Sequence, residues 1–451
     1  MHPAQETLTG HAGLEKLMQT SLLGIAQKAK QFKKCRFRNL YGLLNSNFLK
    51  EAWRSINKKA AAGVDKISAK KFAENLDGNI NEIADKLKRK RYRAKLVRRV
   101  YIPKGKDKTR PLGIPAIADK VLQSAAVKIL EAIYEQDFLP NSYGYRPRVG
   151  AKTAVKALTE ELQFKKYSYI VEADIKGFFD NINHDRLINM LEIRIEDRAF
   201  IGLIKKWLKA GIMEPDGQVV NPITGTPQGG IISPILANIY LHYTLDIWFE
   251  KVVKPRCEGE AYMCRYADDF ICAFRYKKDA ERFYKVLGLR LNRFGLELAT
   301  DKTNIISFSR FRISENTSFD FLGFEFRWQV SRKGRDVIKK RTSRSKMRKS
   351  LAYAKQWCKE NRNNRLANLF KTLNAKLRGY YNYYGIIGNY DSLNEYYRIT
   401  KKMLYKWLNR RSQRRSFNLC QFEQVLKRHR IELPRIMEKP NNQLELDFSF
   451  V

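Results

Sequence analysis

Apolar positions in the N-terminal part of the chain recur every three or four residues, as they do on one face of a helix. The pattern is clearest in FRNLYGLLNSNFLKEAWRSI, and we expect helical structure across 14–60. AAAGVDKIS at 60–68 interrupts it. The basic run at 86–115 then alternates apolar and polar residues, which predicts two strands joined by a turn at KGKDK.

The middle third mixes strand and helix patterns. YSYIVEADI at 167–175 and YMCRYADDFICAF at 262–274 are typical of buried strands, with helical patterns between them. This mixture favours an α+β fold over a regular alternation around a parallel sheet. We expect four parts: an N-terminal helical extension at 1–62, a mixed region at 63–330, a basic helical domain at 331–430 and a short tail at 431–451.

The charge of the chain indicates what kind of partner it binds. The chain has 87 Lys and Arg against 46 Asp and Glu, a net charge of +41, and its 44% hydrophobic residues suffice for packed cores. A compact protein with this excess repels itself unless a polyanion is its usual partner. Nucleic acid is the leading partner because neutralised phosphates release counterions, and an anionic membrane surface is the alternative.

Cysteine and hydropathy patterns indicate a compartment. The six cysteines form no CxxC pair, which disfavours a zinc knuckle or a disulfide framework and fits a reducing cytosol. The N-terminus has acidic residues and no apolar stretch of a secretory signal. The longest uncharged segment, 217–245, contains three prolines, which argues against a membrane span. We therefore expect a soluble cytoplasmic protein without a membrane partner.

Carboxylates interrupt two apolar strands. Asp174 follows the run YIVEA, and Asp268 and Asp269 stand in RYADDFICAF, at the tip of an expected tight hairpin. A carboxylate in such surroundings is costly unless it is paired or bound to a metal. Carboxylate ligands with room for water and phosphates suit Mg²⁺, and two such ions can assist an in-line phosphoryl displacement. The alternative is that Asp268 and Asp269 are only turn formers.

Six motifs follow one another in a fixed order. They are IPKGKDKTRPLGIP, VEADIKGFFDNI, TPQGGIISPILANI, YADD, FGLELATDKTNIISF and FLGF. With this order, roughly residues 15–430 resemble the group II intron-encoded reverse transcriptases and maturases. The resemblance implies a right-hand polymerase with fingers and palm at 63–330, followed by an α-helical thumb and maturase domain at 331–430.

The resemblance assigns catalytic roles to matching positions. Asp174 and Asp268 would hold two Mg²⁺ ions, Asp269 would assist them, and the Ile175 carbonyl would bind the same ion as Asp174. Phe179 would contact the sugar and exclude a 2′-hydroxyl by its bulk. An ordinary core phenylalanine is the alternative for Phe179.

Other matching positions would bind the incoming nucleotide. Gln228, Gly229 and Gly230 would lie near it, since glycine lets backbone approach a substrate, and a plain turn is the alternative. Arg110 and Lys104 would clamp the triphosphate, Arg110 as a planar fork and Lys104 as a point charge that could equally be only solvated.

The last two motifs imply further contacts to the substrates. Lys302 would contact the triphosphate or protonate the leaving pyrophosphate, with a solvated lysine as the alternative. Leu322 and Gly323 in FLGF would shape the primer grip, or serve packing alone.

KLRGYYNYYG at 376–385 carries the maturase part of the resemblance. Lys376 and Arg378 with Tyr380 and Tyr381 combine phosphate binders with stacking faces, which suits RNA binding. The alternative is that at least two of the four tyrosines in this segment are core residues. Many relatives carry a further His/Cys-rich nuclease domain. No such centre can be built after LPRI, so we expect no second-strand cleavage by this chain and a primer supplied from elsewhere.

The resemblance implies an RNA-directed DNA polymerase that also assists splicing and mobility of the intron RNA. Its partners would be intron RNA, an RNA template, a DNA primer, target DNA and deoxynucleoside triphosphates, near the nucleoid of a bacterial cytosol. A homodimer is compatible with the sequence, which leaves the oligomeric state open. Alternatives are a host-recruited reverse transcriptase for defence or repair, a splicing factor with a decayed polymerase site, and a basic protein that coats nucleic acid. The intact acidic motifs argue against decay, and the ordered motifs against a coat protein.

Overall fold

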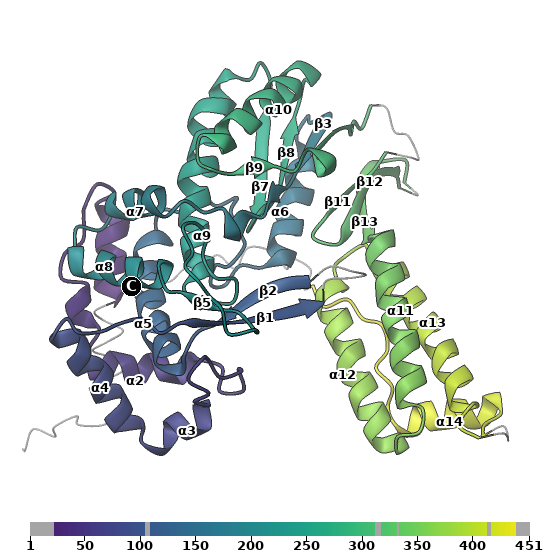
Figure 1. Ribbon diagram of the computed structural model, residues 1–451. Coiled ribbons are helices and arrows are strands. Elements are labelled where there is room, and N and C mark those ends of the chain that lie inside the picture. Colours follow the sequence, from purple (N-terminus) through teal and green to yellow (C-terminus); the bar gives the residue numbers. More distant parts are fainter. Residues whose placement is uncertain (1–21, 104–108, 312–316, 332, 413–415, 439–451) are drawn as a thin grey trace, which may run out of the picture. The chain divides into compact units, whose positions relative to one another are not determined.

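The computed structural model describes residues 22–103, 109–311, 317–331, 333–412 and 416–438. The chain divides into two compact units, and Figure 1 labels many of its helices and strands. The first draws on 1–150, 173–272 and 278–304, and the second on 151–172, 273–277 and 305–451. Both helices and sheets are present, as the mixed α+β class requires. Within the described ranges, no helix has both the length and the apolar character that crossing a bilayer demands.

The first unit holds most of the strands of the sheets and a set of short to medium helices. Its helices are α2 (Ser46–Ser55), α3 (Ala69–Glu74), α4 (Leu76–Lys88), α5 (Ile117–Tyr134), α7 (His184–Glu192), α8 (Arg198–Leu208), α9 (Ser233–Leu241) and α10 (Lys277–Asn292). Its strands are β1 (Val97–Pro103), β2 (Thr109–Ile114), β4 (Ile175–Lys176), β5 (Ile212–Met213), β6 (Val219–Val220), β7 (Ala261–Tyr266), β8 (Asp269–Phe274) and β9 (Glu297–Leu298).

Helix starts in this unit follow side-chain caps. Asn45 accepts a hydrogen bond from the Phe48 amide at the start of α2, and Asn183 does the same for α7. The helical expectation across 14–60 holds only in part. Residues 22–31 are helical, but Asn39 then adopts a left-handed φ of 58°, and α2 begins as a new helix after its own cap. Residues 14–21 lie outside the described residues.

The two strands predicted in the basic run at 86–115 are confirmed. β1 and β2 pair antiparallel, with Arg98 opposite Ile114 and Ile102 opposite Arg110. The predicted turn at 104–108 lies outside the described residues. β5 pairs parallel with β1, and the sheet has the order β2-β1-β5-β6. Arg110 is therefore carried on the exposed outer strand of this sheet.

YMCRYADDFICAF forms the predicted hairpin. Ala267 and Asp268 make the turn between β7 and β8, and Asp269 is the first residue of β8. These strands belong to a sheet of order β10-β3-β8-β7, in which β3 (Tyr169–Ala173) is next to β8. Because β3 ends at Ala173, this pairing of neighbours brings Asp174 toward the acidic turn.

The second unit combines a three-stranded sheet with the C-terminal helices. Its elements are α6 (Ala151–Phe164), β10 (Asn304–Ser307), β11 (Phe319–Phe321), β12 (Phe324–Val330), β13 (Asp336–Thr342), α11 (Arg344–Asn361), α12 (Leu366–Tyr384), α13 (Tyr390–Leu408) and α14 (Leu419–Arg428). The basic helical domain expected at 331–430 begins with a strand, β13, before its helices. β13 pairs antiparallel with β12, so this part of the basic run satisfies its backbone in a sheet before α11 begins.

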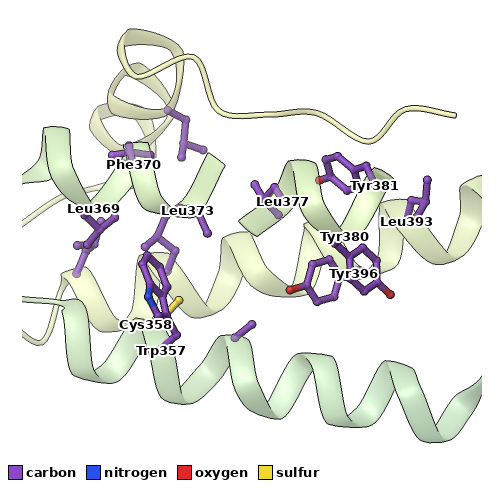
Figure 2. Packing of buried hydrophobic residues seen from close by; sticks show 14 of the residues in the cluster. Trp357, Cys358, Leu369, Phe370, Leu373, Leu377, Tyr380, Tyr381, Leu393 and Tyr396 are labelled. Carbon is purple, nitrogen blue, oxygen red and sulfur yellow. The ribbon is translucent and has the colours of Figure 1, made fainter. Parts of the chain in front are cut away.

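Apolar side chains from α11, α12 and α13 form one core in the second unit (Figure 2). Trp357 on α11, Leu373 and Leu377 on α12 and Leu393 on α13 are all buried there. On α12, the buried residues Leu373 and Leu377 are four residues apart, which is the amphipathic spacing that the sequence shows for these helices. The amphipathic helices predicted between about 350 and 430 are therefore confirmed for the described residues, as α11 to α14.

Candidate active site

An open cavity of about 750 Å³ in the first unit collects most of the residues predicted for catalysis and nucleotide binding. Its wall comes from β2, from the segments after β3 and before α9, from the turn between β7 and β8, and from residues 299–302. The predicted residues that line it are Arg110, Asp174, Ile175, Phe179, Gln228, Gly229, Gly230, Asp268 and Lys302. Motifs that are far apart in the sequence thus face one space.

Some predicted residues lie elsewhere. Asp269 is exposed at the start of β8 and does not line the cavity. Lys104 lies outside the described residues. Leu322 and Gly323 belong to the second unit, at the turn between β11 and β12, where their φ values are 50° and 81°. The Tyr383 hydroxyl donates a hydrogen bond to the Leu322 carbonyl at 2.9 Å, so this turn is anchored to α12.

Asp174 forms an ion pair inside the cavity. Lys302 Nζ lies 2.5 Å from Asp174 Oδ2, and the Ala299 amide donates to the Asp174 carbonyl at 2.9 Å. The hydrogen bond and the negative charge of Asp174 raise the pKa of Lys302 against the opposing effect of desolvation. The Asp174 side chain is 26% exposed and the Lys302 side chain is 62% exposed. Solvent therefore screens this ion pair and keeps its contribution to stability small. A cation that binds Asp174 Oδ2 would compete with this ammonium group.

Phe179 projects from a short 3₁₀ turn, Phe178–Asp180, and is half-buried. Its ring contacts Tyr145 edge to face, with the ring centroids 6.2 Å apart. The Thr226 amide donates to the Phe179 carbonyl at 2.8 Å, which joins the TPQGG segment to this turn. Tyr145 also lines the cavity, a position that the sequence patterns did not single out. Burial, followed by the charge of Asp268, raises the pKa of its phenol.

Gly229 allows two loops to meet at the cavity wall. Its φ is 102°, and a Cβ at this position would lie 2.8 Å from the Gly113 carbonyl oxygen. The Gly113 amide donates to the Gln228 carbonyl at 2.5 Å. A side chain at position 229 would therefore force this segment away from β2 and change the cavity.

The sequence comparisons agree with this geometry. Residues 102–326 match the family "Reverse transcriptase (RNA-dependent DNA polymerase)", and residues 345–428 match "Group II intron, maturase-specific domain". The chain belongs to the group II intron reverse transcriptase and maturase family. The first match includes every lining residue named above, and the second spans nearly all of α11 to α14.

Three relatives illustrate the similarity. The group II intron-encoded protein LtrA of Lactococcus lactis subsp. cremoris is 33% identical over 399 residues, which cover 70% of this chain and 65% of LtrA. Protein YkfC of Escherichia coli strain K12 is 31% identical over 302 residues, 60% of this chain and 77% of YkfC. The putative COX1/OXI3 intron 1 protein of Saccharomyces cerevisiae is 26% identical over 402 residues, 71% of this chain and 47% of that protein. The chain thus spans about two thirds of LtrA and less than half of the yeast relative.

Reverse transcriptases generally use divalent metal ions. Within the part of the chain that the structure describes, no three His, Cys, Asp or Glu side chains cluster as a closed metal cage. The donors present nevertheless fit Mg²⁺, because this ion takes one or two carboxylates and completes its shell with water and substrate phosphates. Asp174 and Asp268 are both only half-buried and supply two such carboxylates to one cavity.

A buried ion pair supports the turn that carries Asp268. The Arg265 guanidinium donates to the two Asp246 carboxylate oxygens at 2.7 and 2.5 Å, and both side chains are fully buried. It also donates to the Ala267 carbonyl at 3.0 Å. Ala267 has a left-handed φ of 57°, which is unfavourable for a residue with a Cβ. Arg265 therefore fixes the carbonyl of the strained residue directly before Asp268. The sequence signalled this network only by an arginine inside an apolar strand.

Gly144 lies against the same turn. A Cβ at this position would be 2.1 Å from the Ala267 amide nitrogen, so Gly144→Ala has to displace the turn that carries Asp268. We expect a loss of primer extension of at least about tenfold, because misplacing a catalytic group by about 1 Å costs on the order of a hundredfold. The measurement is the primer extension rate, with circular dichroism as a check on folding. Gly150→Ala is the control, since its Cβ would meet nothing within 4 Å; equal rates in the two variants would contradict the expectation.

The residues predicted to bind RNA on α12 differ in their surroundings. Tyr381 is fully buried and Tyr380 is 9% exposed (Figure 2). The stacking role predicted for Tyr381 is therefore wrong, because helical spacing places it on the core side of α12 with Leu377. Arg378 pairs with Glu432 at 2.6 Å near the surface. Lys376 is half-exposed and remains available to an anion.

Proposed function

We propose that this chain is an RNA-directed DNA polymerase that copies RNA into cDNA, and that it binds intron RNA and assists group II intron splicing and mobility. The observation that carries the polymerase proposal is the cavity in which Asp174, Asp268 and the TPQGG loop face one another within a reverse transcriptase match. The maturase-specific match on α11 to α14 supports the second part. In finer terms, the proposed architecture is a right-hand polymerase with fingers and palm, followed by a thumb and maturase domain.

The proposed chemistry is an attack of the primer 3′-hydroxyl on a deoxynucleoside triphosphate, with pyrophosphate leaving. Asp174 and Asp268 would bind two Mg²⁺ ions, with Asp269 and the Ile175 carbonyl in support; such ions stabilise the attacking and leaving oxygens. With Asp174 engaged in this way, Lys302 would no longer be paired with it. Its ammonium is then free to contact the triphosphate or to protonate the leaving pyrophosphate.

The remaining cavity residues would position the substrates. Arg110 is exposed on β2 and offers a planar fork to the triphosphate. Gln228 and Gly229 would contact the nucleotide from the loop held by Gly113. Leu322 and Gly323 would form the primer grip on the turn anchored by Tyr383. The RNA template and target DNA would bind the basic surface of the chain.

Phe179→Val is expected to weaken discrimination against ribonucleotides. The half-buried ring beside Tyr145 would fill the space that a 2′-hydroxyl needs, and valine removes most of that bulk. We expect the ratio of deoxynucleotide to ribonucleotide incorporation to fall by about tenfold or more, roughly 1.4 kcal/mol of selectivity. Single-nucleotide incorporation kinetics measure this ratio. Phe200→Val is the control, because Phe200 is buried on α8 and does not line the cavity, so it should affect folding without changing the ratio. An unchanged ratio in Phe179→Val would assign Phe179 to packing.

The maturase part is tested by purifying the protein from its native cells and sequencing the RNA that is bound to it. One dominant structured RNA that spans the coding region of this protein is the expected result. Diverse cellular RNAs, or one unrelated non-coding RNA, would replace the maturase proposal with a host-recruited reverse transcriptase.

Two further expectations stay predictions, namely a location near the nucleoid of a bacterial cytosol and a homodimer.

A further inference from the structure

A second cavity, of about 380 Å³, lies in the second unit between α11, α12 and α13. Aromatic side chains from all three helices line it, namely Tyr353 and Trp357 on α11, Tyr380 on α12 and Tyr396 on α13. The exposed fractions are 61% for Tyr353 and below 10% for the other three. Tyr353 therefore stands at the rim, and the remaining rings form the inner wall.

The inner wall is a stacked pair of tyrosines. The rings of Tyr380 and Tyr396 lie with their centroids 3.8 Å apart and their planes within 14° of each other (Figure 2). Burial raises the pKa of Tyr396 to about 12, so its hydroxyl stays protonated at neutral pH. The pair gives the cavity a flat aromatic surface with protonated hydroxyls at its edges.

Lys376 holds a positive charge over the rim. Its Nζ donates to the Tyr353 hydroxyl at 2.9 Å and lies 4.7 Å from the centroid of that ring. It is also 5.6 Å from the centroid of the Trp357 ring, so two aromatic faces hold the ammonium in place. The side chain is half-exposed, and an anion can approach it from solvent.

A buried hydroxyl in the cavity has an unused hydrogen-bonding capacity. Thr400 is 3% exposed and lines the cavity. Thr400 Oγ1 makes no well-aligned hydrogen bond with any described residue, although its hydroxyl is near enough to the Tyr396 phenol to oppose the rise in the pKa of that group. Such an atom is costly to bury and accepts a polar group of a ligand readily.

We propose that this cavity binds one unstacked nucleotide of single-stranded RNA. The base would stack on the aromatic rings, a phosphate would bind Lys376, and the ribose hydroxyl would reach Thr400. A volume near the lower end of the range for small-ligand cavities suits one nucleotide and excludes a duplex. The net charge of +41 attracts anions, which favours an anionic ligand over a neutral apolar one. This inference rests on the proposed RNA-binding function and names one place where that RNA is recognised.

The test uses the full chain and a twelve-nucleotide oligouridylate that carries one 4-thiouridine. Photo-crosslinking followed by peptide mapping should place the thiouridine on Tyr353 or Trp357. In equilibrium binding, Tyr353→Ala should weaken affinity about tenfold, within the range of loss for one base stacked on an aromatic side chain. Tyr390→Ala is the matched control, because Tyr390 is 49% exposed on α13 and does not line the cavity.

A second pair of variants separates the cavity from general electrostatics. Lys376→Met and Lys371→Met each remove one charge from α12, but only Lys376 lines the cavity. The loss of affinity should be about fivefold greater for Lys376→Met, since both variants lose the same non-specific attraction. Thermal unfolding of each variant reports whether the helices still pack.

Three outcomes would overturn the inference. Equal affinities for Tyr353→Ala and Tyr390→Ala would exclude stacking in this cavity. Crosslinks outside α11 to α13 would place the nucleotide elsewhere, and stronger crosslinking of a matched thiothymidine DNA strand would assign the cavity to DNA. If the unaltered chain binds neither strand, the proposed RNA-binding function fails first, which is a distinguishable result.

Discussion

Asp268→Asn is expected to abolish primer extension while leaving RNA binding within about twofold of the unaltered chain. The amide retains the size of the side chain but removes the charge that would hold Mg²⁺ at the tip of the β7–β8 hairpin. The loss should be about a thousandfold or more, because charge stabilisation at the reacting phosphate is usually the largest single contribution to such catalysis. The measurements are Mg²⁺-dependent extension of a DNA primer on an RNA template, and filter binding of the same RNA.

Asp185→Asn is the control for this substitution. Asp185 is an exposed carboxylate in the first turn of α7, on the same unit but outside the cavity. The control should extend the primer at the normal rate. Retained extension in Asp268→Asn would remove the assignment of the cavity as the polymerase site, and a joint loss of RNA binding would indicate misfolding instead.

Arg265→Leu is expected to destabilise the first unit by about 3–5 kcal/mol, because it leaves the Asp246 carboxylate buried without its partner. The two side chains are fully buried and their charges are 2.5 Å apart at the closest atoms. Urea unfolding followed by circular dichroism measures the loss. A change below about 1 kcal/mol would show that water or another side chain replaces the guanidinium.

The double variant Arg265→Leu with Asp246→Leu separates stability from positioning. Removing both charges should recover most of the stability, since a buried pair can be replaced by apolar residues at little cost. The Ala267 carbonyl still lacks its donor in the double variant, and the left-handed turn before Asp268 loses its anchor. Primer extension should therefore stay low after stability has recovered. If the double variant recovers both its stability and its primer extension, the Arg265–Asp246 pair contributes to folding alone.

The sequence predicted the local structure of the site well where the pattern is short and regular. The apolar runs on both sides of YADD predicted the hairpin, and the strand predicted at 167–175 is present as β3, which ends directly before Asp174. Order and spacing of the motifs were enough to name residues that line one cavity. The contacts among these residues could not be predicted from the sequence. Nothing in it pairs Asp174 with Lys302 or places Tyr145 against Phe179.

The misses share one physical cause. Helix and strand patterns depend on neighbours two to four residues away, whereas burial depends on which elements pack together. Four tyrosines at 380–384 present both sides of α12, and only the packing of α11 and α13 decides that Tyr381 is enclosed. In the same way, the basic residues of β13 have a composition typical of a solvated helix. They form a strand because β12 pairs with them.

The sequence by itself determined the family of this protein, its excess of positive charge and the acidic, glycine-containing and aromatic motifs of the candidate site. These properties are local, because each depends on residue types and their spacing. The tertiary structure decided which of these residues share a cavity, that Arg265 and Asp246 support the acidic turn, that Gly144 leaves room for it, and that rings from three helices enclose a second cavity. These depend on contacts between residues far apart in the chain, which only the folded backbone brings within bonding distance.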